Sequence, residues 1–177
     1  ELRQGVTSIC PASMTLSEET LKTVCANAYA YTKRPEAEQD TGARLIGIHL
    51  EGPFISMEKK GAQNPAYIRN PDVEMFLRLR AHYHGNAPVP NDSSKSYLKD
   101  EALFAYQVKI IRRLADQVHI SVGHTCSDYE TAYRAFSQGA DHVTHFFNAM
   151  PPFTHRAPGV FGAAFDAKHV MPELICD

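Results

Sequence analysis

Three side chains with metal-binding chemistry stand where apolar, strand-like stretches end. Glu51 closes the stretch LIGIHLE, while His124 and His145 close the stretches VHISVGH and DHVTH. The carboxyl ends of parallel strands meet at one edge of a sheet, where α/β proteins keep their sites. One carboxylate and two imidazoles with an open position are a recurring ligand set for catalytic zinc and similar divalent ions. The alternative is a hydrogen-bonded structural cluster, or separate strand-end histidines with satisfied partners.

The stretch at residues 45–53, LIGIHLEGP, organises the prediction. Its near-continuous apolar run is typical of a strand covered on both faces, as in a parallel sheet. His49 and Glu51 are two residues apart, so strand periodicity points them the same way, just before the Gly52-Pro53 turn. A buried carboxylate there is costly unless it meets a cation, a network of donors or a metal.

Several longer motifs share a family likeness. HLEGPF, KKGAQNP, SVGHT, THFFNAM and HRAPG occur in this order, and together they resemble the N-acetylglucosamine-6-phosphate deacetylase family of the metal-dependent amidohydrolase superfamily. The resemblance implies a (β/α)8 barrel of the TIM type whose divalent metal is held by Glu51, His124 and His145. Zinc is the first choice of ion, with iron, cobalt or manganese as alternatives.

The same resemblance implies which residues hold the substrate, a small-molecule sugar phosphate. Asn148, Ala149 and Arg156 are expected to contact it, with Arg156 on its phosphate. Gln63 stands where many relatives have histidine in a GAHNP motif. Glutamine can still donate a hydrogen bond to a sugar or acetyl oxygen, but it cannot take a proton. For Arg156 the alternative is an exposed loop arginine that only solvates the surface.

Strands and helices are expected to alternate along the chain. The β-branched and apolar runs, the caps and the glycine and proline breaks predict strands at residues 5–11, 41–51, 118–124, 141–150 and 170–177, and helices from Ser17 to about Thr32, from about Pro71, at Glu101–Asp116 and at Ser127–Gln138. These elements predict an α/β fold, a partial (β/α)8 barrel in which residues 1–177 form the central part of the hydrolase barrel.

Two predicted loops carry histidines and lysines that could either bind a ligand or be solvated at the surface. Residues His82 to Lys99 are rich in Pro, Gly, Asn, Asp and Ser, and they predict an irregular loop where relatives carry another barrel strand. His82 and His84 within it are interpreted as surface histidines rather than a metal pair. Lys59 and Lys60 are likewise interpreted as solvated loop cations.

Compared with the complete pattern of the family that it resembles, the chain is expected to be one piece of a longer enzyme. The small β domain and the last barrel strands are expected to be absent, and the general-base aspartate is expected beyond residue 177. Asp177 belongs to an earlier motif and is rejected as the base. The isolated chain is therefore expected to be inactive, and the complete enzyme is expected to be a homodimer.

Composition limits the kinds of partner. The chain has 177 residues, 44% hydrophobic and 21% charged, with a formal net charge of -2 and a pI near 6.5. These values are ordinary for one globular domain and give no basic footprint for nucleic acid or an anionic membrane. Four scattered cysteines without CxxC spacing indicate reduced thiols, and a cytoplasmic location is the default expectation.

Three functions follow from these patterns. The first is metal-dependent hydrolysis of the acetamide of N-acetylglucosamine 6-phosphate to glucosamine 6-phosphate and acetate. The second is an amidohydrolase acting on another N-acyl sugar or a cyclic amide, and the third is a non-catalytic metal-binding fragment. Arg156 separates the first function from the second. A neutral substrate would not need that arginine, so its presence favours the phosphorylated sugar.

Overall fold

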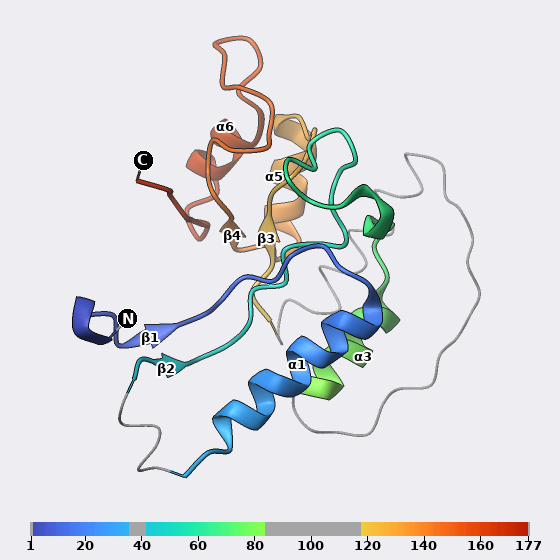
Figure 1. The fold of residues 1–177 in the computed structure, drawn as a ribbon. Helices are drawn as coiled ribbons and strands as arrows, with labels where there is room; N and C mark the ends of the chain where they lie inside the picture. The colour runs from blue at the N-terminus through green and yellow to red at the C-terminus, as the bar shows by residue number, and fades with distance from the viewer. Residues whose placement is uncertain (1, 36–41, 84–117, 177) are drawn as a thin grey trace. The chain divides into compact units, whose positions relative to one another are not determined.

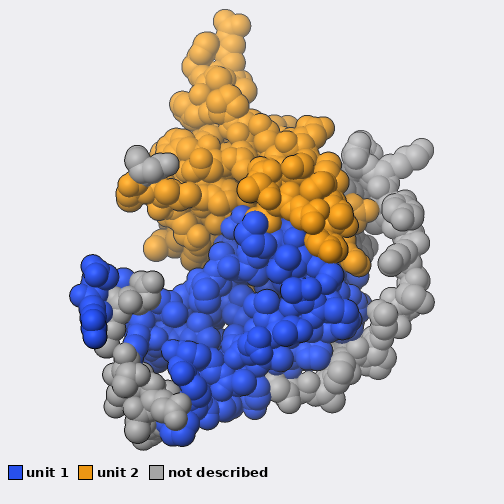
Figure 2. Space-filling model, in the orientation of Figure 1, with its two compact units in different colours: residues 1–53, 72–95 blue, residues 54–71, 96–177 orange. Residues whose placement is uncertain are grey.

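The chain forms two compact units in the computed structural model, which describes residues 2–35, 42–83 and 118–176. Figure 2 shows unit 1, at residues 1–53 and 72–95, and unit 2, at residues 54–71 and 96–177. The described strands pair in parallel, and helices alternate with them along the chain. The predicted α/β class is therefore confirmed.

Unit 1 combines two parallel strands with two helices. After a short 3-10 turn, η1 (Leu2–Gln4), strand β1 (Ser8–Ile9) pairs with β2 (Arg44–Leu45). Helix α1 (Glu18–Thr32) packs along α3 (Val73–Tyr83), as Figure 1 shows.

Each of these helices begins at the residue that its capping signal predicted. The Ser17 side chain accepts a hydrogen bond from the Thr20 amide, and the Asp72 carboxylate accepts one from the Met75 amide. A bidentate ion pair joins the two helices, in which Arg78 Nε and Nη2 donate to the Glu18 carboxylate at 2.7 and 3.1 Å. Because Arg78 is buried, this pair fixes how α1 and α3 meet.

The long buried strand predicted at residues 41–51 is wrong in extent and in burial. Regular pairing covers only Arg44–Leu45, followed by a single parallel bridge between Ala12 and His49. Ile46 is 58% exposed, and Leu45, Ile48 and Leu50 are only partly buried. Within the described part of unit 1 the stretch pairs with β1 alone, and its partly exposed side chains differ from the strand covered on both faces that its apolar pattern predicts.

Unit 2 is built on three parallel strands. They are β3 (Ser121–Val122), β4 (His142–Val143) and β5 (Met171–Pro172), in the spatial order β3-β4-β5. Helix α5 (Tyr129–Ser137) connects β3 to β4, and helix α6 (Gly159–Asp166) precedes β5. The core between the helices and the sheet includes Phe136, Val143 and Phe161, each no more than 2% exposed.

The structure shortens two predicted strands in unit 2 and adds two elements that were not predicted. The predicted strand at residues 141–150 ends at Val143, and residues 144–150 form turns instead. The last strand is only Met171–Pro172, although the Glu173 amide still donates to the Val143 carbonyl. Helix α6 and the 3-10 turn η2 (Pro65–Tyr67) were not predicted, since glycine and proline at their starts argued for loops.

Other predictions fall on residues outside the described ranges. The helix at Glu101–Asp116, His84 and Asp177 lie there, as does most of the loop predicted at His82–Lys99. Its first residue, His82, belongs to the last turn of α3. No helix among the described residues is long and apolar enough to cross a membrane.

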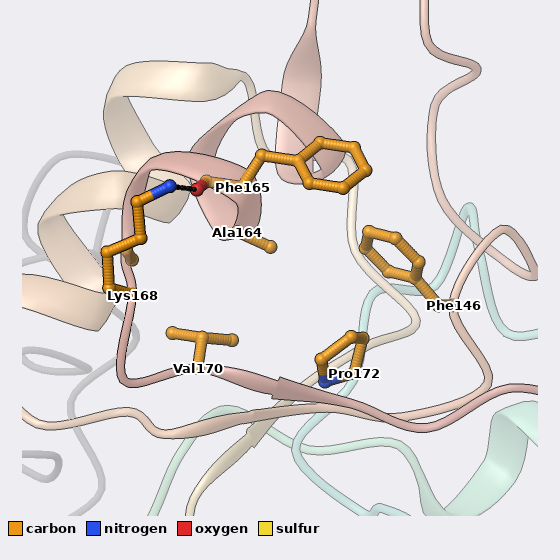
Figure 3. A pocket seen from close by; sticks show the side chains of 7 residues that line it. Phe146, Ala164, Phe165, Lys168, Val170 and Pro172 are labelled. Carbon is orange, nitrogen blue, oxygen red and sulfur yellow. Dashed lines mark hydrogen bonds between the residues drawn. The ribbon is translucent and has the colours of Figure 1, made fainter.

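One hollow in unit 2 lies between α6 and β5 (Figure 3). Its lining is apolar except for Lys168, whose ammonium donates to the Phe165 carbonyl at 3.0 Å. A catalytic pocket needs several polar groups that converge on one point, and this hollow has none besides that lysine among the described residues. This hollow is therefore not suited to catalysis.

Candidate metal centre

His124 and His145 occupy equivalent positions after two paired strands. Val122 and Val143 are partners in the register of β3 and β4, and each histidine follows its valine by two residues. The two side chains therefore reach the same edge of the unit 2 sheet, at the carboxyl ends of its strands. This is the edge at which parallel sheets position ligands.

The two imidazoles face each other through their Nε2 atoms. These nitrogens are 2.9 Å apart, and the rings meet edge to face with centroids 4.6 Å apart. Two nitrogens that each lie about 2.1 Å from one ion are about 3.0 Å apart at a right angle and about 3.4 Å apart at the tetrahedral angle usual for zinc. The spacing therefore fits two adjacent ligands of one divalent ion.

A backbone carbonyl orients the His124 ring. His124 Nδ1 lies 2.7 Å from the Lys59 carbonyl oxygen, so this nitrogen carries the ring proton and donates it there. Nε2 then carries the lone pair of the ring and is the atom that a metal takes. The ring is only 6% exposed, and the His124 carbonyl accepts from the Ser56 amide, so both ends of the residue are fixed.

His145 is less constrained than His124. Its Nδ1 is buried and has no hydrogen-bond partner within the described part of the chain. The hydrogen bonds assign the His124 proton to Nδ1, so His145 Nε2 is the donor between the two rings when both are neutral. Binding of an ion would shift the His145 proton to Nδ1.

The backbone around both histidines is unusual. His124 and His145 have φ angles of 44° and 31°, and Phe147 and Ala149 have φ angles of 81° and 52°. Non-glycine residues seldom adopt this left-handed region, and such residues gather at functional sites. The turns after β3 and β4 therefore have the local strain that a site of fixed geometry retains.

The turn after β4 also places two of the predicted substrate residues. The Asn148 amide donates to the His145 carbonyl at 2.8 Å, which leaves the exposed Asn148 side chain free to face solvent. The Ala149 carbonyl accepts from the Thr125 amide at 3.1 Å. Backbone hydrogen bonds thus join the loops that follow β3 and β4 beside the two imidazoles.

Gln63 and Arg156 differ in exposure. Gln63 is 3% exposed in the loop that carries Lys59, and its amide donates to the Lys60 carbonyl. Arg156 is exposed on a tight turn closed by hydrogen bonds between Thr154 and Ala157. The segment that holds this turn protrudes from unit 2 between β4 and α6 (Figures 1 and 2).

Glu51 belongs to unit 1. Its carbonyl accepts a hydrogen bond from the Thr15 hydroxyl at 3.1 Å, and its side chain is half-buried. At the next residue, Gly52, an added Cβ would lie 2.0 Å from Thr15 Oγ1, and φ is 85°, so the turn accepts only glycine. Unit 1 therefore holds the Glu51 backbone firmly.

Sequence reasoning missed one contributor to this centre, the Lys59 carbonyl. The lysine was interpreted as a solvated cation, and its side chain remains unassigned, yet its backbone orients His124. A backbone carbonyl exists at every position and leaves no mark in the residue type. Only the geometry identifies it.

Comparison with known proteins identifies relatives for the whole length of the chain. It is 36% identical over 175 residues to N-acetylglucosamine-6-phosphate deacetylase of Bacillus subtilis, which covers 98% of this chain and 42% of that protein. The Bos taurus deacetylase of the same name is 37% identical over 99% of this chain and 42% of its own length. No family model matches the chain.

Solved structures agree with the sequence comparison. N-acetyl-D-glucosamine-6-phosphate deacetylase from Mycobacterium smegmatis superposes with a TM-score of 0.73 at 28% identity, over 95% of this chain and 40% of that one. The chain is thus homologous to these deacetylases, and it spans about 42% of the length of the relatives it matches.

Proposed function

We propose that this chain provides the metal-binding part of an enzyme that hydrolyses the acetamide of N-acetylglucosamine 6-phosphate, releasing glucosamine 6-phosphate and acetate. The homology to deacetylases of that name over 98% of the chain supports the reaction. The observation that carries the proposal is the pair of imidazole nitrogens 2.9 Å apart. A partial (β/α)8 barrel is the architecture that we infer for the parallel strands and their helices.

Glu51, His124 and His145 are proposed to hold the ion together, with zinc as the expected metal. The two histidines supply nitrogens at a spacing that suits adjacent ligands. Glu51 lies two residues after the single bridge between His49 and Ala12, and a carboxylate completes the preference of zinc for nitrogen and oxygen ligands. A divalent ion bound there supplies a water of lowered pKa and polarises the acetyl carbonyl.

The remaining residues would orient the substrate. Asn148 and the Ala149 backbone lie in the turn that carries His145, so groups that they bind are brought beside the metal ligands. The buried Gln63 is suited to donate a hydrogen bond to a sugar or acetyl oxygen. No carboxylate among the described residues is assigned the role of general base.

Arg156 is proposed to bind the phosphate. Its side chain is exposed, and the described residues offer it no ion pair, so its guanidinium is available for a bidentate contact. Cytoplasmic location and a homodimeric complete enzyme stay predictions.

A second candidate substrate is the epimeric sugar phosphate. N-acetylgalactosamine-6-phosphate deacetylase of Shewanella sp. is 33% identical over 98% of this chain and 40% of its own length. Both sugars would present the same acetamide and the same phosphate to the proposed residues. The choice between them therefore depends on contacts to a single ring hydroxyl.

The test combines metal analysis with an activity assay on the protein that carries this chain. We expect about one zinc at this centre, lost in His124→Gln and in His145→Gln, and acetate release from N-acetylglucosamine 6-phosphate that these variants lack. His155→Gln, which alters an exposed histidine of the same unit, serves as the control for metal content. Full zinc content in both ligand variants would overturn the metal assignment.

The substrate arm of the same assay compares the two sugar phosphates and unphosphorylated N-acetylglucosamine. Faster turnover of the galactose epimer would replace the proposed substrate with the second candidate. Zinc binding without acetate release from any of the three sugars would leave the non-catalytic metal protein as the better description.

A further inference from the structure

A second group of ligand-type side chains lies at the other end of the same strands. Ser121 and His142 are partners at the start of β3 and β4, and His119 and Asp141 lie just before them. This group therefore occupies the amino-terminal ends of the strands, whereas His124 and His145 follow the carboxyl ends. None of its residues has a role in the proposed hydrolysis.

The three side chains converge on one carboxylate. His119 Nδ1 lies 2.6 Å from Asp141 Oδ2, and His142 Nδ1 lies 3.0 Å from Asp141 Oδ1. The two rings meet edge to face with centroids 4.7 Å apart. One ligand atom from each residue lies within 4.8 Å of the others, close enough for a single ion to contact all three.

One ring nitrogen of His142 is buried without a hydrogen bond to any described residue. Its Nδ1 is buried, and the contact with Asp141 Oδ1 is not aligned as a hydrogen bond, so no described residue satisfies it. A buried imidazole nitrogen without a hydrogen bond costs free energy. An ion between His142 and Asp141 would supply the missing partner.

Asp141 is held in place and kept ionised. Its Oδ1 accepts a hydrogen bond from the Ile120 amide at 2.9 Å, which ties the start of β4 to the segment before β3. Partial burial raises the pKa of the carboxyl, but contacts with the His142 and His119 imidazoles and the Ile120 hydrogen bond outweigh it and lower the pKa to about 2. The carboxylate is therefore ready to act as a ligand at neutral pH.

A simple histidine-carboxylate ion pair explains the arrangement less well. One imidazole is enough to neutralise one carboxylate, and two protonated rings at this separation would repel each other. The side chain of His119 is 80% exposed, whereas those of Asp141 and His142 are 30% and 24% exposed. The cluster is thus open to an ion from solvent on the His119 side.

We propose that His119, Asp141 and His142 form a second metal site, for a divalent ion that accepts imidazole and carboxylate ligands, such as Zn²⁺ or Ni²⁺. Two imidazoles exclude Mg²⁺ and Ca²⁺, which take oxygen ligands. A bound ion joins the segment before β3 to the first residues of β4, so it braces the sheet that positions His124 and His145 at its far end. The site is structural, with solvent completing the coordination.

The experiment counts Zn²⁺ ions and assigns each to one end of the strands. Calorimetric titration of the metal-free chain should find two equivalents in the original sequence, one in His119→Gln and one in His124→Gln. His155→Gln should keep both, since it removes an exposed histidine outside either group. Mg²⁺ at the same concentrations should bind at neither group.

Asp141→Asn provides the independent variant. Its amide oxygen can still accept from the Ile120 amide, so the strand start is preserved while the anionic ligand is lost. We expect the affinity of the second site to fall at least about 10-fold, the lower bound for loss of groups that tune a metal site. Circular dichroism of the metal-free variants establishes that they fold like the original chain.

The outcomes separate the two sites. A second equivalent that survives in both His119→Gln and Asp141→Asn would overturn the amino-end site, as would a single equivalent that His124→Gln abolishes. A single equivalent lost in His119→Gln and kept in His124→Gln would support the amino-end site while the metal centre of the proposed hydrolase fails.

Discussion

The two ends of β3 and β4 each bring two histidines together, but in different ways. At the carboxyl ends, His124 and His145 face each other directly through Nε2, on backbone in the left-handed region. At the amino ends, His119 and His142 both turn their Nδ1 atoms to the Asp141 carboxylate, which lies just before β4.

That difference relates to function. Two imidazoles fill two coordination positions of an ion and leave others for a ligand from elsewhere in the chain and for a water or substrate oxygen. A group of two imidazoles and one carboxylate leaves fewer coordination positions for a substrate and is better suited to stabilise the fold. We therefore place catalysis at the carboxyl ends and bracing at the amino ends.

The largest expected effect is the loss of metal from one end without the other. His145→Ala should reduce zinc at the carboxyl-end centre from about one equivalent to nearly none, because a single imidazole and a carboxylate hold zinc poorly. His142→Ala is the matched change at the amino end and should leave that centre occupied. Elemental analysis after dialysis should find about one equivalent of zinc in each single variant and nearly none when the two changes are combined, and loss of both equivalents in either single variant would remove the distinction between the ends.

Arg156→Ala should weaken the phosphate contact at the carboxyl end. Loss of a charge-assisted bidentate contact costs about 1.5 to 3 kcal/mol, or about 10-fold to 150-fold in kcat/KM on the phosphorylated sugar. Unphosphorylated N-acetylglucosamine should be affected little. Arg134→Ala removes the same charge from the exposed face of α5 and is the control; equal losses on both sugars in Arg156→Ala would contradict the phosphate role.

Gly123→Ala should disturb the carboxyl ends through packing. An added Cβ would lie 2.4 Å from Thr144 Cγ2, so the Thr144 side chain would have to rotate or β3 and β4 to separate beside the histidines. We expect a loss of about 1 to 3 kcal/mol in the free energy of unfolding, measured in urea, and weaker zinc binding.

Thr144→Ser in the same chain provides the rescue, because serine lacks the methyl group that the new Cβ meets. The double variant should recover most of the stability and zinc affinity of the original chain. If it stays as unstable as Gly123→Ala, the close approach of these two residues does not position the site.

The smallest expected effect concerns α5, which connects the two ends. Asp128 caps this helix, and hydrogen bonds from the Thr131 side chain and the Thr131 amide lower the pKa of its carboxyl below the ordinary 3.8. Asp128→Ala should cost about 1 kcal/mol at neutral pH. Asp128→Asn should cost less, because asparagine also caps well.

The pH dependence of this cap follows from the direction of the shift. Since the folded-state pKa is lowered, the stabilisation is complete above pH 3.8 and is lost as the pH falls through the folded-state value. The difference in unfolding free energy between the original chain and Asp128→Ala should therefore shrink in acid. A difference that is constant from pH 7 to pH 2 would mean that the charge of Asp128 does not stabilise the cap.

Local signals predicted the helices well. The starts of α1, α3 and α5 were predicted from Ser17, Asp72 and the residues before Tyr129. A capping side chain satisfies backbone amides that are adjacent in sequence, so this signal is local. Helix α6 was not predicted, because Pro158 and Gly159 at its start are typical of loops. Its stability comes from the packing of Val160 and Phe161 in the core, which the local sequence does not show.

Strand lengths and the amino-end cluster could not be predicted in the same way. The apolar run around Ile46 predicts a strand that is covered on both faces. A residue pattern cannot show whether other elements of the chain cover those faces. His119 and Asp141 are 22 residues apart and form no motif, so only the register of β3 with β4 brings them together. The meeting of His124 with His145 was expected from their strand ends, and their role as ligands stays a prediction.

The most direct test of the carboxyl-end centre is long-range ¹H–¹⁵N NMR of the histidine rings during zinc titration of the chain. The account predicts that His124 and His145 both bind through Nε2 and both carry their ring proton on Nδ1 in the zinc-bound form, so His145 changes tautomer while His124 does not. Zinc binding that leaves the Nε2 signals of His124 and His145 unchanged would contradict it.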